Sequence, residues 1–477
     1  MPRWCSISTT RCSCPGVRAE RPFTRWPRPG GHTERVNRKR SSVPSTRLGR
    51  LTHFGKTAGQ FALGGAVERV RRLGPGGREA AHNVFLTADN ARRLADGLTR
   101  MRGAALKMGQ MLSMESEDFL PPEFARALAP VRNAANGMPL SQIRRVMGRE
   151  YGKGWEDRFF DFDYLPIAAA SIGEVHRART TDGRDVALKI QYPGVAKSID
   201  SDVDNMASLL RLVQLLPAGL DFSDLVGEAK RQLHQEADYA QEARYLEAYR
   251  ALVADDSRFL VPRVHEDLST KRVLAMDYLE GVPLESLGEP GVPQTTRDRV
   301  GALLEHLVFR ELFEFRTMQS DPNFANYLYQ PETERIVLLD FGSTVTYDPG
   351  MTGRYARIAR ALMENDDDAV RHYAERLGYI DPDKQPGYTE RALEFIQLIC
   401  EPLRTPGPFD FGASDLLDRA RTLGMDMAVE GMRDEATLPP PETMFLHRKL
   451  VGSYMLCARL GARVDVQALI RPFLQAA

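Results

Sequence analysis

Three short motifs, widely separated but in a fixed order, constrain this 477-residue chain more than any other feature. The first is a small-residue stretch from Ala168 to Val175, and the second is an apolar run that ends in Lys189. The third is a loop from Asp321 to Asn326, which an apolar segment joins to a triplet beginning at Asp340. Each motif alone is common, but their order and intervals together indicate one composite site.

The intervals match the nucleotide site of protein kinases. In that site a hairpin covers the ATP phosphates, and a lysine on the following strand contacts them. Between Val175 and Lys189 stands Thr181-Asp182-Gly183, and an Asp-Gly pair between two apolar runs is a strong signal for a hairpin turn. We therefore predict two antiparallel strands that place the lysine beneath the hairpin.

The third motif carries side chains suited to metal and acceptor chemistry. Asp321 and Asn326 occupy the first and last positions of the kinase pattern D-x-x-x-x-N, so Asp321 is expected to address the acceptor or water and Asn326 to hold a metal ion. Asp340, which follows the apolar strand predicted at 336–339, is expected to hold Mg²⁺ against the phosphates. The predicted cofactors are ATP or ADP and Mg²⁺.

Composition limits the class of protein. The formal net charge is zero, which argues against a nucleic-acid-binding protein. We find no apolar run long enough for a membrane-spanning helix. The five cysteines lack zinc-binding spacing, and a disulfide framework is not expected.

The pattern of the chain predicts four regions. They are a disordered or leader-like tail at 1–47, a helical N-terminal extension at 48–150, a kinase-like N-lobe with inserted helices at 151–281, and a helical C-lobe carrying the metal site at 282–477.

Inside the N-lobe we expect one helix at 233–249 and two strands, at 262–266 and 272–278. The second strand ends at Met276 and Tyr278, in the place of a kinase hinge, where the backbone binds adenine.

Departures from an ordinary protein kinase resemble the UbiB/AarF (ADCK-type) family of atypical kinases. Of the glycine-rich loop only Gly173 remains, because alanines stand at 168 and 170. The catalytic loop reads Gln-Ser-Asp-Pro-Asn over 319–323 in place of H-R-D, and Lys107-x-Gly-Gln110 precedes the small lobe. Within this family, the Asp-Pro-Asn-x-x-Asn motif at 321–326 most resembles the coenzyme-Q-linked mitochondrial and proteobacterial branch. The resemblance implies an α+β, protein-kinase-like bilobal fold with a helical Lys-x-Gly-Gln extension and a mostly helical C-lobe.

The resemblance also implies roles for individual residues. Glu242 is the expected ion-pair partner of Lys189, and Glu236 with Asp238 would meet Lys107. Asp238 and Glu242, four residues apart on the predicted helix, would share a face. The cofactor-binding set is then Ala168, Ala169, Ala170, Ser171, Gly173, Val175, Lys189, Glu236, Asp238, Glu242, Met276 and Tyr278; the catalytic set is Asp321, Lys189, Lys107 and Gln110; the metal set is Asn326 and Asp340.

The alanines and the extension both argue against ordinary transfer to a protein. Methyl groups at Ala168 and Ala170 restrict the backbone and keep it from approaching phosphate as bare glycine does. By resemblance, the helix carrying Lys107 and Gln110 lies across the place where a protein substrate would dock.

The family implies an ATP- and Mg-binding atypical kinase or ATPase that supports ubiquinone biosynthesis at a membrane. Its partners would be nucleotide, a lipid or quinone precursor and quinone-biosynthesis proteins, with peripheral membrane contact and no nucleic acid. The expected location is the cytoplasmic side of a bacterial inner membrane or the matrix side of a mitochondrial one. Two alternatives stay open: a small-molecule phosphotransferase of the aminoglycoside- or choline-kinase type, and a non-catalytic scaffold switched by nucleotide.

Overall fold

The computed structural model describes residues 137–170, 172–212, 223–381, 386–434 and 441–475, together with Thr52, Gly55, Gly59, Arg92, Ala95 and Asp96. All of these belong to one unit, residues 38–477.

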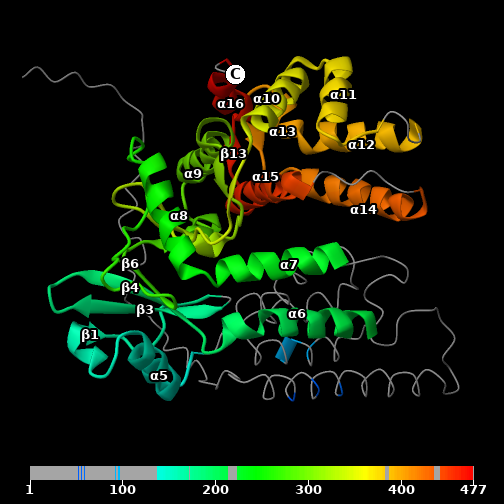
Figure 1. Cartoon of the computed structure of the whole chain (residues 1–477). Coiled ribbons are helices and arrows are strands. Elements are labelled where there is room, and N and C mark those ends of the chain that lie inside the picture. The colour runs from blue at the N-terminus through cyan, green and yellow to red at the C-terminus, as the bar shows by residue number, and fades with distance from the viewer. Residues whose placement is uncertain are drawn as a thin grey trace, which may run out of the picture. The chain divides into compact units, whose positions relative to one another are not determined.

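A five-stranded sheet of antiparallel neighbours carries Lys189 (Figure 1). The strand order is β1-β3-β4-β6, and β2 pairs with the same strand, β3, as β1 does. The strands are β1 (Phe159–Phe162), β2 (Ala168–Ala169), β3 (Gly173–Thr180), β4 (Asp185–Gln191) and β6 (Val273–Asp277), preceded by helix α5 (Leu140–Glu150) and the 3-10 turn η2 (Trp155–Arg158).

Strand β4 lies inside this sheet, between β3 and β6, and its side chains are buried on both faces. Val186, Leu188 and Ile190 are fully buried on one face, and Ala187 and Lys189 are buried on the other. Continuous burial is typical of a strand covered on both sides. The predicted hairpin turn before it is confirmed, with Gly183 at a φ of 90°, a backbone angle that glycine adopts without strain.

Three helices are inserted between β4 and β6: α6 (Val195–Leu212), α7 (Ser223–Glu236) and α8 (Tyr239–Leu252). Helices α6 and α7 lie side by side (Figure 1), joined by a buried cluster. The cluster consists of Ile199, Val203, Ala229 and Leu233.

The single helix predicted at 233–249 is wrong. The chain leaves the helix after Glu236, and Asp238 takes a non-helical backbone angle with φ −95° and ψ 82°. Its carboxylate accepts a hydrogen bond from Gln241 N and so caps the first turn of α8. Asp238 therefore does not share a helical face with Glu242; it caps the helix that carries Glu242.

The strand predicted at 262–266 is also wrong, whereas β6 confirms the second strand. Only Val264 forms a bridge, with Met276. Pro262 has no N–H to donate, and the N–H groups of Arg263 and Val264 donate to the side chains of Asp277 and Glu247. These side-chain acceptors replace the regular ladder.

The remaining chain is mainly helical, which confirms the α+β prediction. Its helical elements are η3 (Leu284–Gly288), α9 (Gln294–Phe309), the π-helix η4 (Arg310–Phe315), η5 (Phe324–Asn326), α10 (Pro349–Glu364), α11 (Asp367–Arg376), α12 (Pro386–Ile399), α13 (Glu401–Arg404), α14 (Leu416–Asp434), α15 (Pro441–Leu460) and α16 (Val466–Gln475). Within the described residues, no helix is both long and apolar enough to cross a membrane.

Short strands position the loops between these helices. A four-stranded sheet has the order β5-β10-β9-β7, and two further pairs are β8 with β11 and β12 with β13. Their bounds are β5 (Phe259–Leu260), β7 (Val282–Pro283), β8 (Thr317–Gln319), β9 (Tyr327–Gln330), β10 (Arg335–Leu338), β11 (Thr344–Thr346), β12 (Phe409–Asp410) and β13 (Arg463–Val464). Because β8 precedes the Asp321 loop and β11 follows Asp340, their pairing brings the two loops together.

Helix α9 contains a buried acid, Glu305, that faces α15. Cys457 Sγ lies 3.6 Å from Glu305 Oε1. Burial raises the pKa of Glu305 to about 7.

We predict that Glu305 makes the stability of the fold depend on pH. Between pH 4.5 and about 7 the folded carboxyl keeps a proton that the unfolded chain releases, so the free energy of unfolding should fall as pH rises through this window. Glu305→Gln should flatten that dependence in chemical denaturation, whereas Glu289→Gln, at an exposed position, should leave it as in the wild type. An unchanged slope in Glu305→Gln would refute the assignment.

Candidate functional site

Lys189 lies at the centre of a buried cluster of opposite charges. Its Nζ is 2.6 Å from Glu242 Oε1 and 3.2 Å from Asp340 Oδ2. The three side chains come from β4, from α8 and from the end of the segment that follows β10. The ring of Tyr239 also lies against the ammonium, 5.4 Å from its centroid to Nζ. The structure therefore brings together three residues separated widely in sequence.

The electrostatics of the cluster keep the lysine charged. Burial acts to lower the pKa of Lys189, but Asp340 and Glu242 outweigh it and leave that pKa well above its ordinary value. Burial raises the pKa of Glu242 to about 7, against the opposing pull of Lys189. The second oxygen of Glu242, Oε2, is buried and accepts no hydrogen bond from the described residues.

Asp340 is the part of the cluster that reaches solvent. Its Oδ1 accepts a hydrogen bond from Gly342 N at 2.9 Å, which fixes the carboxylate. The side chain is nevertheless 35% exposed, compared with 9% for Lys189. The Asp340 carboxylate therefore places negative charge on the solvent-facing side of the buried ammonium.

Asp321 and Asn326 lie in the neighbouring loop. Asn326 Nδ2 donates to the carbonyl oxygen of Asp321 at 3.0 Å, so the asparagine closes the loop on itself. Leu339 N donates to Asn326 O at 3.0 Å. This backbone bond joins the loop directly to the residue that precedes Asp340. The candidate metal-binding residues therefore lie on adjacent segments.

The alanine-rich segment is a strand followed by a tight turn, rather than a turn throughout. Ala168 and Ala169 form β2 and pair with Val175 and Glu174 of β3. Ala170 N then donates to Gly173 O at 2.9 Å to close the turn. Ser171, like Lys107 and Gln110, lies outside the described residues.

Gly173 is the position where this turn approaches the rest of the site most closely. A Cβ added there would lie 2.5 Å from Ile190 O and 2.7 Å from the hydroxyl oxygen of Tyr239. The space between the turn and the strand that bears Lys189 therefore admits only glycine.

The remaining predicted cofactor-binding residues lie around the same strands. Met276 pairs with Ala187 of β4, and Tyr278 N donates to Asp185 O at 3.1 Å, so the segment continues along the edge of β4. The Arg177 guanidinium lies 4.1 Å from the centroid of the Tyr278 ring.

Glu236 ends α7 beside the Asp340 triplet. A Cβ on Gly342 would lie 3.8 Å from Glu236 Cα. Asp238 caps α8, as described above, and its Oδ1 binds Gln241 N at 3.0 Å.

Comparisons with known proteins agree with this geometry. Residues 130–374 match the ABC1 atypical kinase-like domain. The chain belongs to the ABC1 atypical kinase-like family. It is 38% identical over 431 residues to the atypical kinase COQ8B, mitochondrial, of Rattus norvegicus, covering 90% of this chain and 80% of the rat protein. It is 36% identical over 437 residues to the atypical kinase COQ8, mitochondrial, of Saccharomyces cerevisiae, covering 91% of this chain and 86% of the yeast protein.

Among solved structures, the chain is similar to the Rv3197–erythromycin complex from Mycobacterium tuberculosis. The identity is 27% and the TM-score 0.57, covering 80% of this chain and 94% of that chain. The predictions of an atypical-kinase family and of a kinase-like fold are therefore confirmed. The predicted enzyme class, an atypical kinase, is that of the ABC1 family.

One further residue of this site, Arg448 of α15, was not identified from the sequence. Its guanidinium donates from Nη2 to Asp321 Oδ1 at 2.8 Å. The contact joins residues 127 positions apart. An arginine on a helix carries no local signal for such a role, because charged residues usually lie on solvated helix faces.

Asp340 and Asn326 carry oxygen atoms of the kind that Mg²⁺ prefers. No group of three or more His, Cys, Asp or Glu side chains arranged for a metal occurs within the described part of the chain. Magnesium is usually held by one or two carboxylates together with substrate phosphates and water, rather than by an all-protein cage. In that mode Asp340 would supply a carboxylate and Asn326 an amide oxygen.

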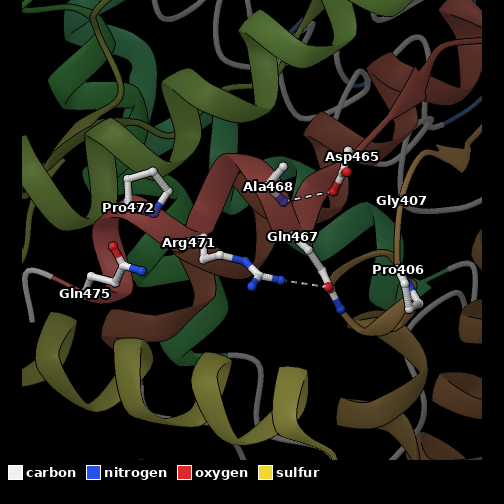
Figure 2. A pocket seen from close by; sticks show the side chains of 8 residues that line it. All are labelled: Pro406, Gly407, Asp465, Gln467, Ala468, Arg471, Pro472 and Gln475. Atoms are coloured by element: carbon white, nitrogen blue, oxygen red, sulfur yellow. Dashed lines mark hydrogen bonds between the residues drawn. The ribbon is translucent and has the colours of Figure 1, made fainter.

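A cavity of about 430 Å³ at the start of α16 contains none of these residues (Figure 2). Its lining includes Gln467 and Arg471, whose side chains hydrogen-bond each other, and Pro406 and Gly407 of the preceding loop. Asp465, at its edge, accepts a hydrogen bond from Ala468 N and caps the helix. None of the residues that line this cavity belongs to the Lys189 cluster.

We predict that Gly173→Ala destabilises the fold, because the new methyl group would overlap the backbone carbonyl of Ile190. The expected loss of unfolding free energy is about 1–3 kcal/mol. Gly148→Ala is the matched control: it lies inside α5, nothing lies within 4 Å of the added methyl group, and alanine favours helix. Equal thermal midpoints for both variants would contradict the close approach at Gly173.

Proposed function

We propose that this protein is an ATP- and Mg-binding atypical kinase or ATPase that supports ubiquinone biosynthesis. The observation that carries the proposal is the contact of Lys189 with both Glu242 and Asp340. A lysine held by a helix carboxylate, beside a second carboxylate open to solvent, is the arrangement that positions nucleotide phosphates in kinases.

The individual roles follow from the contacts. Lys189 stays protonated and would bind the α- and β-phosphates, while Glu242 fixes its direction. Asp340 and Asn326 would hold Mg²⁺, which neutralises charge that develops on the phosphates. Asp321 would orient the acceptor, alcohol or water, and the hydrogen bond from Arg448 fixes the direction of its carboxylate.

The alanine-rich loop is expected to limit how closely the nucleotide phosphates can approach its backbone. Alanines at 168 and 170 replace the flexible glycines of ordinary kinases, and Ala168 lies on a strand paired to β3. Met276 and Tyr278 would meet the adenine at the hinge, and Lys107, Gln110 and Ser171 are assigned by family resemblance alone.

The quinone assignment rests on the relatives. Rat and yeast proteins similar over most of the chain are named atypical kinases COQ8B and COQ8, both mitochondrial. We assign this chain the same pathway, with a lipid or quinone precursor and quinone-biosynthesis proteins as partners. Its place would be peripheral to the membrane, on the matrix side in a mitochondrion or the cytoplasmic side in a bacterium.

We predict that mant-ATP binds the wild type in the presence of Mg²⁺ and that the site variants bind it more weakly. Lys189→Ala removes the phosphate-facing ammonium, and Asp340→Asn removes a metal-binding charge at nearly constant shape. Each should raise the Kd roughly 10-fold or more in a fluorescence titration. The exposed Lys271→Ala should bind as the wild type does. No binding by the wild type, or unchanged binding by folded Asp340→Asn, would refute the nucleotide site.

A second prediction separates an enzyme from a scaffold. In a yeast strain lacking its COQ8, the chain behind a mitochondrial leader should restore ubiquinone, measured in lipid extracts. Asp321→Asn should fail, because an amide cannot accept the acceptor's proton as a carboxylate does. Asp161→Asn, at an exposed position, should restore ubiquinone normally. Full restoration by Asp321→Asn would favour a non-catalytic scaffold.

A further inference from the structure

Glu311 joins three elements beneath the candidate site through one buried carboxylate. It lies in η4, the π-helical turn between α9 and β8, and is fully buried. Its Oε1 accepts hydrogen bonds from the Tyr249 hydroxyl at 2.8 Å and from Gln319 N at 2.9 Å. Its Oε2 lies 3.1 Å from Lys449 Nζ. These two donors and the ion-pair partner Lys449 belong to α8, β8 and α15 respectively.

Each of these three partners lies beside a residue of the proposed nucleotide site or next to its neighbour in the chain. Tyr249 follows Glu242 by about two turns of α8, and its ring centroid lies 4.7 Å from that of Phe341, the neighbour of Asp340. Gln319 Nε2 donates to the carbonyl oxygen of Asp321 at 3.0 Å. Glu311 therefore touches, through one intermediate each, the helix that holds Lys189 and the loop that carries Asp321.

The third partner, Lys449, connects the loop to α15. It follows Arg448, which binds the Asp321 carboxylate, and its Nζ also lies within 3.5 Å of Gln319 Oε1 and 3.4 Å of the Tyr327 hydroxyl oxygen. Two consecutive residues of α15 thus contact the start of the loop: Arg448 contacts the Asp321 carboxylate, and Lys449 contacts the Gln319 side chain.

A close backbone approach independently fixes α15 against the same loop. Gly452 lies one turn after Arg448, and a Cβ added there would fall 1.9 Å from Pro322 Cγ. Pro322 directly follows Asp321. The helix and the loop are therefore in contact without room for a methyl group, so a shift of α15 would displace the loop.

The energetics favour a positioning role over a stabilising one. Burial raises the pKa of Glu311; burial also acts to lower the pKa of Lys449, but the Glu311 carboxylate outweighs it and keeps the ammonium charged. A buried ion pair adds little net stability, because well-packed apolar side chains of similar volume often do as well or better. What the pair supplies, and apolar packing does not, is a set of directional bonds.

We propose that Glu311, Lys449 and Tyr249 are positioning residues that hold the Asp321 loop in register with the Lys189–Glu242 pair. The inference rests on the proposed function, since it assigns these residues to turnover at that site. They contact neither phosphate nor acceptor; they act through Gln319, Arg448 and α8.

The test compares Glu311→Gln and Lys449→Met with a matched control in the full chain. The control is Glu305→Gln, which changes an equally buried acid on α9 whose carboxyl group lies against Cys457 of α15. Mant-ATP affinity, the kcat of Mg-ATP hydrolysis and the thermal midpoint are measured for each. Both test variants should lose roughly 10- to 100-fold in kcat with the Kd for mant-ATP nearly unchanged, because misplacement of reacting groups by about 1 Å has effects of this size. The control should keep the wild-type kcat.

A double variant separates positioning from stability. Glu311→Gln with Lys449→Met removes both charges but leaves an amide oxygen to accept from the Tyr249 hydroxyl and Gln319 N. It should recover the thermal midpoint that Lys449→Met loses, without recovering kcat. Tyr249→Phe, which removes one hydroxyl, should show a smaller loss of kcat. Recovery of kcat together with the midpoint would overturn the proposal and leave only a structural brace.

The outcomes also distinguish this inference from the proposed function. A wild type that binds no mant-ATP would overturn both. Normal kcat in Glu311→Gln, with binding intact, would overturn the inference alone. If the wild type binds but turns over too slowly to measure, amide hydrogen exchange decides: faster exchange confined to 319–326 in Glu311→Gln supports the proposal, and unchanged exchange overturns it.

Discussion

The contact of one buried ammonium with two carboxylates is the interaction on which the site depends. Lys189 comes from the sheet, Glu242 from the inserted helices and Asp340 from a loop beyond β10. A buried lysine without such partners would lose its proton or carry a large desolvation penalty. The charge requirement therefore fixes the chemistry of the site and adds a direct contact between the sheet, α8 and the Asp340 loop.

The parts of this arrangement that the sequence predicts are those with local signals. The Asp182-Gly183 turn determines how β3 and β4 pair, and the apolar run before Asp340 determines where β10 ends. Motif order then suffices to place Lys189 and Asp340 in one site. Where the local sequence pattern predicts the wrong element, contacts with other parts of the chain determine the structure. Nothing between 233 and 249 interrupts the helical pattern, yet Asp238 ends one helix and begins the next.

The residues that sequence reasoning did not find share a different property. Glu311, Arg448 and Lys449 are charged residues in helical segments, where solvated faces are the ordinary expectation. Their burial and direction depend on partners far along the chain, such as Asp321 for Arg448. Gly452 is similar, because a glycine within a helix gives no indication of which side chain lies against it. Such roles follow only from packing.

Helix α15 also determines the order in which the molecule can be assembled. Strands β3 and β4 are neighbours along the chain, so they can pair soon after synthesis, whereas the guanidinium that holds Asp321 arrives 127 residues later. A nascent chain that has emerged only as far as β11 already contains Lys189, Glu242 and Asp340 but has no Arg448, Lys449 or Gly452 to contact the loop. Ribosome-bound intermediates therefore pass through a stage in which the charge cluster is complete while the acceptor side of the site is still unconstrained.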